Sequence, residues 1–336
     1  MKLGKCAAAL VVTSFLLTGC QNSSKTVKED GKYVVASLNS GKKDKNIFAD
    51  DIFNDVISTA SGKSSYFNAV LQQLMDQKFP IDEDMETDAN ETVDQIQTYY
   101  ENQYGDNAET QLQTALSSSG FNSLDEYREN MVRVYQRCNF LLAYVEKNFD
   151  EVFDDYYTQA SPREASLIKV SMTDVENPTA DETAKLSEVT ALLSSSKSFG
   201  DIAKDYSDDT NTNKNKGKLG IVDTTSGLSQ TFGSDVETKI LALASGETSE
   251  AIKGTDGYYF VKVTSTDKDS IKKEIKKEIK KDLSIDTPLI AYDKYMSYIV
   301  YQSYNVKYDD KNTEKIINNV IDEALKERET SRGGTN

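Results

Sequence analysis

A short helix, a polar loop and a strand follow one another in residues 198–220, whose sequence is SFGDIAKDYSDDTNTNKNKGKLG. The helix is expected to start at Ser198 and to continue through Ile202, Ala203 and Tyr206. The Asp, Asn, Thr and Lys residues that follow are typical of a loop, and the chain then returns to a strand. This rapid change between short elements favours an α+β fold for the surrounding segment.

The same alternation extends over residues 161–266. A capping box at Thr179–Glu182 predicts the start of a helix, and Gly254-Thr255-Asp256-Gly257 between two expected strands predicts a β-hairpin. The expected strands are 164–172, 217–222, 248–253 and 258–264, and the expected helices are 179–195, 198–206 and 234–243. The strands can pair mostly antiparallel with the helices covering the sheet, so this segment is predicted to be one α+β unit.

Helical periodicity dominates on both sides of this unit, in residues 33–160, after a short strand at 33–38, and in residues 267–336. A capping box at Ser123–Glu126 opens the longest helix, which is expected to run to about Tyr157. Its predicted buried stripe is Tyr127, Met131, Val134, Cys138, Leu141, Leu142 and Val145. An α+β domain inserted into an all-helical domain, formed by both flanks together, explains this order.

An acidic segment at residues 82–91 interrupts the helical pattern and is expected to be a loop. Its carboxylates lack the glycine and the spacing of an EF-hand, so no metal is expected there.

The N-terminus predicts a cleaved signal peptide over residues 1–19. Positive charges precede an apolar stretch from Ala7 to Leu17, which is too short to span a bilayer as a mature helix. Cys20 follows Leu-Thr-Gly, which resembles the bacterial lipobox. That resemblance implies cleavage before Cys20, acylation of its sulfur and anchoring on the outer face of the cell membrane. An ordinary signal peptide with a chance cysteine is the alternative. The polar residues 20–32 predict a flexible, lipidated tether.

The composition of the 336-residue chain excludes several kinds of chemistry. The chain has no histidine and three cysteines, so it cannot form a Ser-His-Asp triad or a His-ligated metal site. No metal and no cofactor are therefore expected. Loss of Cys6 with the signal and lipidation of Cys20 would leave only Cys138, which is expected to be a small core residue without a disulfide. The net charge of −16 argues against a nucleic-acid partner.

A lysine-rich amphipathic helix is predicted at residues 270–283. Its lysines are expected to form a solvated face, with contact to anionic lipid or wall polymer as the alternative.

Four stretches of the α+β unit resemble the parvulin family of peptidyl-prolyl isomerases, or rotamases. They are 165–168 (ASLI), 198–209 (SFGDIAKDYSDD), 217–220 (GKLG) and 257–263 (GYYFVKV). With the lipobox and the helical flanks, the whole chain resembles the PrsA-like foldase lipoproteins of Gram-positive bacteria. The flanks match mainly at 120–127 (GFNSLDEY). The resemblance implies a parvulin-like antiparallel sheet with covering helices and a chaperone-like module built from both flanks.

The resemblance also implies a site, with two departures from the family pattern. Parvulins usually have histidine where this chain has Leu167 and Tyr259. Asp209 stands where the family has Cys or Asp, so Asp209 and Tyr259 are the candidate catalytic residues. Leu219, Leu228 and Phe232 match the apolar residues that hold the substrate proline. The alternatives are that Asp209 only caps a loop and that the other side chains only fill the core.

Prolyl isomerisation needs no nucleophile and no net proton transfer, because its barrier of about 18–20 kcal/mol comes from amide resonance. The missing histidines therefore predict weakened or altered isomerase activity rather than certain loss. The resemblance implies an anchored extracellular foldase whose partners are unfolded or partly folded secreted polypeptides, and a homodimer remains open. A non-catalytic holdase is the alternative. A solute-binding lipoprotein is disfavoured because the chain lacks the βα repeats of such domains.

Overall fold

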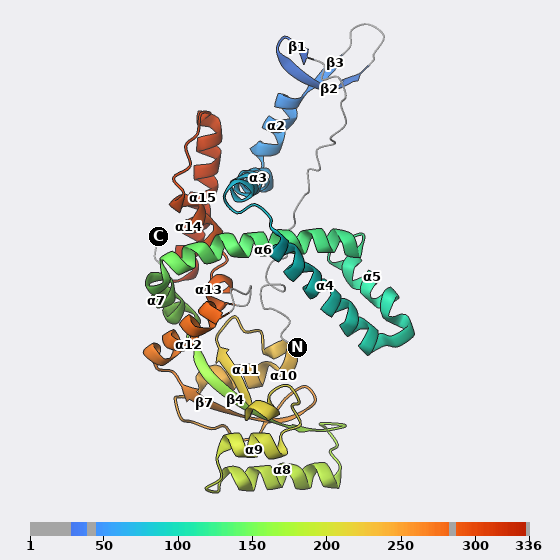
Figure 1. Cartoon of the computed structure of the whole chain (residues 1–336), viewed down its shortest axis with the longest axis vertical. Coiled ribbons are helices and arrows are strands. Elements are labelled where there is room, and N and C mark those ends of the chain that lie inside the picture. The colour runs from blue at the N-terminus through green and yellow to red at the C-terminus, as the bar shows by residue number, and fades with distance from the viewer. Residues whose placement is uncertain (1–27, 39–44, 282–286, 334–336) are drawn as a thin grey trace. The chain divides into compact units, whose positions relative to one another are not determined.

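The computed structural model describes residues 28–38, 45–281 and 287–333 (Figure 1). Contacts divide them into two compact units, Leu142–Lys294 and the combination of 28–141 with 295–333. Helices and antiparallel sheets are both present, so the predicted α+β class is confirmed. Within the described ranges, no helix combines the length and the apolar character that crossing a bilayer requires. The predicted signal peptide and Cys20 lie outside the described residues.

The unit formed by residues 28–141 and 295–333 begins with a small antiparallel sheet. Its strands are β1 (Lys28–Glu29), β2 (Lys32–Leu38) and β3 (Lys45–Phe48), in the order β1-β2-β3. The strand predicted at 33–38 is present as β2, but its pairing with β1 and β3 means that the flanking domain is not all-helical. Residues 28–32 of the predicted tether form β1 and the turn into β2, and the backbone of β1 is paired with β2.

Helices make up the rest of this unit. They are α2 (Ala49–Ser58), α3 (Ala60–Lys78), α4 (Glu83–Tyr104), α5 (Ala108–Ser118), α6 (Leu124–Lys147, of which the part up to Leu141 belongs here), α14 (Met296–Ser303) and α15 (Lys311–Ser331). Phe67 of α3 stacks on Tyr298 of α14 with ring centroids 4.8 Å apart. Tyr66 of α3 shares a hydrogen bond of 2.9 Å with Thr313 of α15. Residues from both ends of the chain thus share one core.

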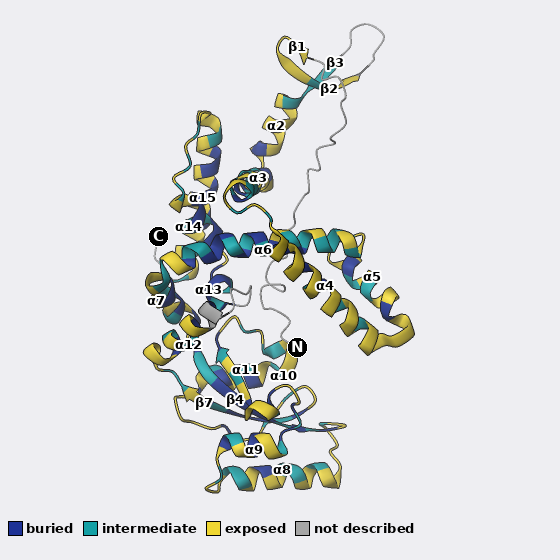
Figure 2. Ribbon diagram, viewed as in Figure 1, coloured by how far each residue is buried: buried dark blue, intermediate teal, exposed yellow. Residues whose placement is uncertain are grey.

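The acidic segment 82–91 is helical, so its prediction as a loop is wrong. The Asp82 side chain accepts a hydrogen bond from the Met85 backbone N–H and caps α4, and three further carboxylates occupy the first turn. Negative charge at this end of a helix is favourable because it opposes the positive end of the helix dipole. Most of α4 is exposed, as Figure 2 shows, and its buried residues are Met85, Ala89 and Val93.

The long helix predicted to reach Tyr157 is two helices, α6 and α7 (Phe149–Ala160). Asn148 separates them with φ −118° and ψ 31°, outside the helical region. Every member of the predicted buried stripe of α6 is buried except Tyr127, which is half-buried. Cys138 in that stripe is fully buried, as expected of a core residue.

The other unit contains a four-stranded sheet in the order β5-β4-β7-β6, with every neighbouring pair antiparallel. Its strands are β4 (Arg163–Ser171), β5 (Lys218–Val222), β6 (Ile252–Lys253) and β7 (Gly257–Ser265). The predicted hairpin is present, although β6 is shorter than expected. In the central pair, Leu167 of β4 lies opposite Val261 of β7, and Lys169 lies opposite Tyr259.

Helices cover both faces of this sheet. The helices are α8 (Ala180–Leu193), α9 (Phe199–Tyr206), α10 (Ser229–Phe232) and α11 (Ser234–Ala242). Figure 1 shows α8 and α9 together on one side, where they pack on Ile168, Val170 and Phe260. On the other side, α11 packs on the core that contains Leu167 and Tyr259, with α10 beside it. We call this second side the Tyr259 face.

The lysine-rich helix α12 (Lys268–Lys281) belongs to the same unit and contacts α7; a short helix α13 (Pro288–Ala291) follows. Three lysines of α12, spaced four residues apart, lie over three aromatic rings of α7, with Nζ 5.1–5.7 Å from the ring centroids. The pairs are Lys268 with Tyr157, Lys272 with Phe153 and Lys276 with Phe149. One side of α12 therefore contacts α7, while Lys273 and Lys277 are exposed, so the predicted solvated face is present in part.

Candidate functional site

The site is built on the Tyr259 face by the alternation of side chains along β4 and β7. Leu167 and Tyr259 are fully buried in its core. Leu219 from β5, Leu228, Phe232 from α10 and Ile252 from β6 are partly buried and pack against this core. The structure therefore brings together Tyr259 and the three predicted proline-binding residues. Side chains of this kind can form an apolar surface for a proline ring, and they can equally serve as core packing.

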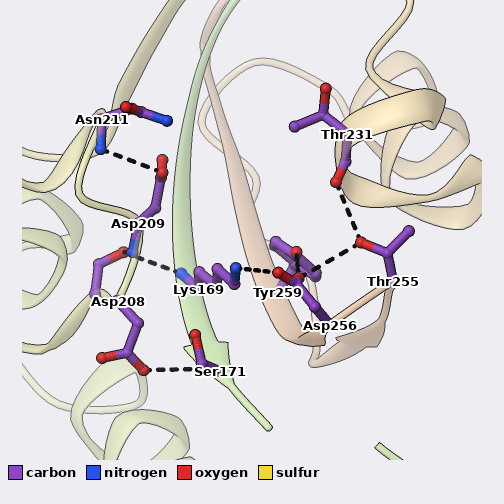
Figure 3. Close-up of polar contacts among 10 residues, drawn as sticks. Lys169, Ser171, Asp208, Asp209, Asn211, Thr231, Thr255, Asp256 and Tyr259 are labelled. Atoms are coloured by element: carbon purple, nitrogen blue, oxygen red, sulfur yellow. Dashed lines mark hydrogen bonds and ion pairs between the residues drawn. The ribbon is translucent and has the colours of Figure 1, made fainter. Parts of the chain in front are cut away.

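The ring of Tyr259 is held from two directions. It meets the ring of Phe232 edge-on, with centroids 5.6 Å apart and planes at 62°. Its hydroxyl donates a short hydrogen bond to Asp256 in the hairpin turn (Figure 3). The other oxygen of the Asp256 carboxylate accepts from Lys169 Nζ at 2.5 Å. Asp256 therefore links the two residues that lie opposite each other on β4 and β7.

The hairpin turn is also tied to α10. Thr255 Oγ1 donates to the Thr231 carbonyl at 3.1 Å, and the Thr255 N–H donates to the Phe232 carbonyl at 3.4 Å. A side chain at Gly254 would collide with this arrangement, because its Cβ would lie 2.3 Å from Cε2 of Tyr259 and 2.4 Å from the Phe232 oxygen. Glycine at 254 thus permits the close approach of the turn to the aromatic pair.

On the other side of the site, Leu228 is fixed by α11. Its backbone N–H donates to Glu237 Oε1 at 2.9 Å, and the Ser229 N–H donates to the second oxygen of the same carboxylate at 3.3 Å. These bonds satisfy backbone donors at the start of α10, which has no side-chain cap of its own. The apolar side chains of α10 are therefore positioned by a carboxylate nine residues further along the chain.

Asp209 lies in the loop after α9 and is buried. Its carboxylate accepts from Thr212 Oγ1 at 2.5 Å and from the Asn211 N–H at 3.3 Å, and its carbonyl accepts from the Asn213 N–H at 2.9 Å. These bonds all remain within its own loop, as in the alternative that Asp209 caps a turn. The negative charge of Asp209 also contributes, as the smallest of several causes, to raising the pKa of Tyr259. Its catalytic role remains a prediction.

Electrostatics keep the phenol of Tyr259 neutral. Burial raises the pKa of the Tyr259 hydroxyl, and the hydrogen bond to Asp256 and the charges of Asp256 and Asp209 raise it further. Burial alone would raise the pKa of Asp256, but the hydrogen bonds from Lys169 and Tyr259 outweigh it and lower that pKa. Asp256 is therefore an anion that accepts from the Lys169 ammonium and the neutral Tyr259 hydroxyl, with Thr255 Oγ1 a third donor at 3.5 Å.

The sequence prediction missed Lys169 and Asp256. Lys169 follows Ala165 and Leu167 at alternate positions of a strand, and this spacing places it on the Tyr259 face, where a charged side chain is unusual. Asp256 was recognised only as part of a turn. The spacing along β4 could have identified Lys169, but no local pattern in the sequence indicates that Asp256 would reach it.

Comparisons with known proteins match this unit to a described family. Residues 167–265 match the family model described as "Rotamase: PPIC-type PPIASE domain". This range covers the four strands except the start of β4, together with the helices that cover them.

The full chain is similar to proteins named "Foldase protein PrsA". The Staphylococcus aureus (strain Newman) protein is 25% identical over 99% of this chain and 96% of its own length. Among solved structures, PrsA from Streptococcus pneumoniae is 21% identical with a TM-score of 0.42, covering 85% of this chain and 99% of its own. PrsA from Bacillus subtilis is 20% identical with a TM-score of 0.39, covering 85% and 98%. The chain is therefore similar to PrsA proteins along nearly its whole length, and its residues 167–265 match the PPIC-type domain family.

Proposed function

We propose that this PrsA-like chain is a membrane-anchored extracellular foldase that binds unfolded or partly folded secreted polypeptides and isomerises their X-Pro bonds. Its activity is altered relative to parvulins with both histidines, because Leu167 and Tyr259 replace them. Catalysis of this kind requires tighter binding of the twisted amide than of either planar form. An apolar surface for the proline ring beside fixed polar groups can provide that difference without a nucleophile.

One observation carries the proposal. Leu219, Leu228 and Phe232 gather against the core that contains Tyr259, on the single face where the polar group of Asp256 and Lys169 also lies. Because the three apolar residues are only partly buried, they leave surface on which a ligand can pack. The match of residues 167–265 to the PPIC-type family supports this assignment of the face.

A protease-coupled assay with a proline peptide tests the enzymatic part. The protein lacking residues 1–19, with Cys20 replaced by serine so that it stays soluble, should raise the isomerisation rate above the uncatalysed rate. The rate should depend linearly on protein concentration. A rate equal to the uncatalysed reaction at high protein concentration would contradict isomerase activity.

A non-catalytic holdase is the second candidate, and the hydrogen bonding of Tyr259 favours it. The Tyr259 hydroxyl already donates to Asp256, and the Asp209 carboxylate accepts hydrogen bonds from its own loop. Both predicted catalytic residues therefore already have hydrogen-bond partners within the protein. Suppression of aggregation of a reduced, unfolded client separates the two functions. A holdase suppresses aggregation without any acceleration of the proline step, whereas the proposed foldase does both.

Anchoring is the third part of the proposal and rests on the sequence around Cys20. Two or more acyl chains give stable attachment, because burial contributes about 0.8 kcal/mol for each CH₂. Expressed in a Gram-positive host, the full chain should incorporate labelled palmitate and sediment with membranes, and Cys20→Ser should do neither. Membrane retention of Cys20→Ser equal to that of the original chain would show that the anchor lies elsewhere.

A further inference from the structure

Lys169 is a charged residue at an inward position of a central strand. Its side chain is 18% exposed, and it lies on the Tyr259 face opposite Tyr259 itself. The backbone at this point is fixed on both sides. The Lys169 N–H donates to Ser207 Oγ at 3.1 Å, and its carbonyl accepts from the Asp208 N–H at 2.9 Å. The loop that carries Asp209 therefore holds the strand at the point where Lys169 projects.

The ammonium of Lys169 has more donors than the protein uses. A lysine ammonium carries three N–H donors. Among the described residues, the Asp256 carboxylate is the one acceptor bonded to Nζ, at 2.5 Å. Two donors are thus left for water or a ligand, on a side chain that is mostly covered. Donors in such a position are costly when they lack a partner, so an acceptor delivered by a bound peptide would bind them strongly.

The chemistry of the prolyl bond defines the acceptor that matters. In the planar amide, the nitrogen lone pair is delocalised into the carbonyl and is a poor acceptor. Twisting the bond localises the lone pair on nitrogen. A donor placed at nitrogen therefore binds the twisted state selectively, whereas a donor placed at the carbonyl oxygen would favour the planar state.

We propose that Lys169 is a catalytic residue of this site, whose ammonium donates a hydrogen bond to the imide nitrogen of the twisted X-Pro bond. This role rests on the proposed isomerase function, and it assigns to Lys169 the hydrogen bond that favours the twisted state. No covalent bond forms or breaks, and the proton stays on Lys169. Asp256 orients the ammonium, while Phe232 and its apolar neighbours hold the proline ring.

The other polar groups of the site are less suited to this role. The Tyr259 hydroxyl donates its single proton to Asp256. The Asp209 carboxylate is an acceptor only and is engaged by Thr212 and Asn211. Leu167, at the position of a family histidine, has no polar atom. Among these described residues, Lys169 is therefore the cationic donor with N–H groups left for a ligand.

Lys169→Met tests the proposal, since methionine keeps the length of the side chain and removes the donors. The expected result is a fall in kcat/KM for a proline peptide of about tenfold or more, the effect of one lost hydrogen bond to a charged group. Affinity for the planar peptide, measured by titration with a non-isomerising analogue, should stay within about twofold, because the contact forms only in the twisted state. Lys169→Arg should retain more activity than Lys169→Met.

Lys197→Met is the matched control. Lys197 is also a partly covered, ion-paired lysine of this unit, bonded to Asp205 at 2.8 Å beside α9, on the opposite face of the sheet. The kcat/KM of Lys197→Met should stay within about twofold of that of the original protein, because Lys197 lies away from the site. Thermal unfolding of each variant identifies misfolding, and Lys169→Leu serves as a second uncharged replacement if Lys169→Met is unstable.

Three outcomes overturn the inference in distinguishable ways. If the original protein is active and Lys169→Met or Lys169→Leu is folded and equally active, then Lys169 has no catalytic role. The proposed isomerase function would be unaffected by that result. Equal losses of affinity and turnover would make Lys169 a residue that binds the planar peptide, not a catalytic one. Original protein that catalyses nothing would remove the isomerase function and this inference together.

Discussion

The ring of Tyr259 meets the ring of Phe232 edge-on, with centroids 5.6 Å apart. A tyrosine at a position where parvulins usually have histidine therefore contacts the residue predicted to hold the proline. This contact is a favourable geometry for two aromatic rings. It makes Phe232 the first residue to test, because Phe232 belongs both to the apolar surface and to the packing around Tyr259.

Phe232→Ala should abolish most isomerase activity at a moderate cost in stability. Phe232 is partly buried, so its loss should reduce the free energy of unfolding by about 1–2 kcal/mol, less than the 3–5 kcal/mol typical of a fully buried phenylalanine. Leu186→Ala is the control, because Leu186 is a partly buried residue on the opposite face. Unchanged turnover in Phe232→Ala would mean that the proline surface has been placed wrongly.

Gly254→Ala should damage the site by crowding alone. The added Cβ would lie 2.3 Å from the Tyr259 ring and 2.4 Å from the Phe232 carbonyl oxygen, so one of them must move. Overpacking of this kind costs about 1–3 kcal/mol, which urea denaturation can measure. Gly200→Ala is the comparison, since its Cβ would meet the Lys216 side chain at 3.1 Å. An equal effect of the two changes would argue against tight packing at Gly254.

Lys272→Met should destabilise the unit that contains α7 and α12. Lys272 Nζ lies 5.3 Å from the Phe153 ring centroid and 3.1 Å from Asp150 Oδ1, and its side chain is 27% exposed. Loss of these contacts, together with the 3.8 Å pair to Asp154, should cost about 1 kcal/mol at low salt, seen as a lower urea midpoint. Lys273→Met, on the exposed side of α12, should leave the midpoint unchanged. Equal midpoints for both variants would show that the lysine–aromatic contacts add no stability.

Acid should weaken the start of α8 through Glu182. Its carboxylate accepts from the Thr179 and Thr173 backbone N–H groups, and these bonds lower its pKa from 4.5 to about 2. Because the folded pKa is the lower one, the stabilisation is complete above about pH 4.5 and is lost as the pH falls toward 2. The fall in Tm between pH 7 and pH 3 should be smaller in Glu182→Gln. Glu188→Gln, exposed on the same helix, should keep the original pH dependence, and a similar change in both would exclude the capping carboxylate as the cause.

The fold of the α+β unit could be predicted because its signals are local. The capping box at Thr179–Glu182 and the turn Gly254–Gly257 are both present where the sequence indicates them. The break at Asn148 could not be predicted, because no proline or glycine marks it. Residues 82–91 were misjudged because acidic residues suit both a loop and the first turn of a helix.

The candidate site was predictable only in part, because some of its contacts join residues that are far apart in the sequence. Leu219, Leu228, Phe232 and Tyr259 came from the resemblance to parvulins, and the structure places them on one face. The bond between Lys169 and Asp256 joins residues 87 positions apart in the sequence. Such a pair depends on the register of β4 against β7, which hydrophobic alternation alone does not specify.

The strand β1 shortens the predicted tether between Cys20 and the folded part of the chain. The first described strand pairs from Lys28, and residues 21–27 separate Cys20 from it in the sequence. The eight residue steps from Cys20 to Lys28 reach at most about 29 Å when fully extended. If Cys20 is lipidated as proposed, β1 cannot rise farther than that above the lipid surface. The height at which the protein could meet a newly exported chain is then limited by this short spacer and by the size of the folded body itself.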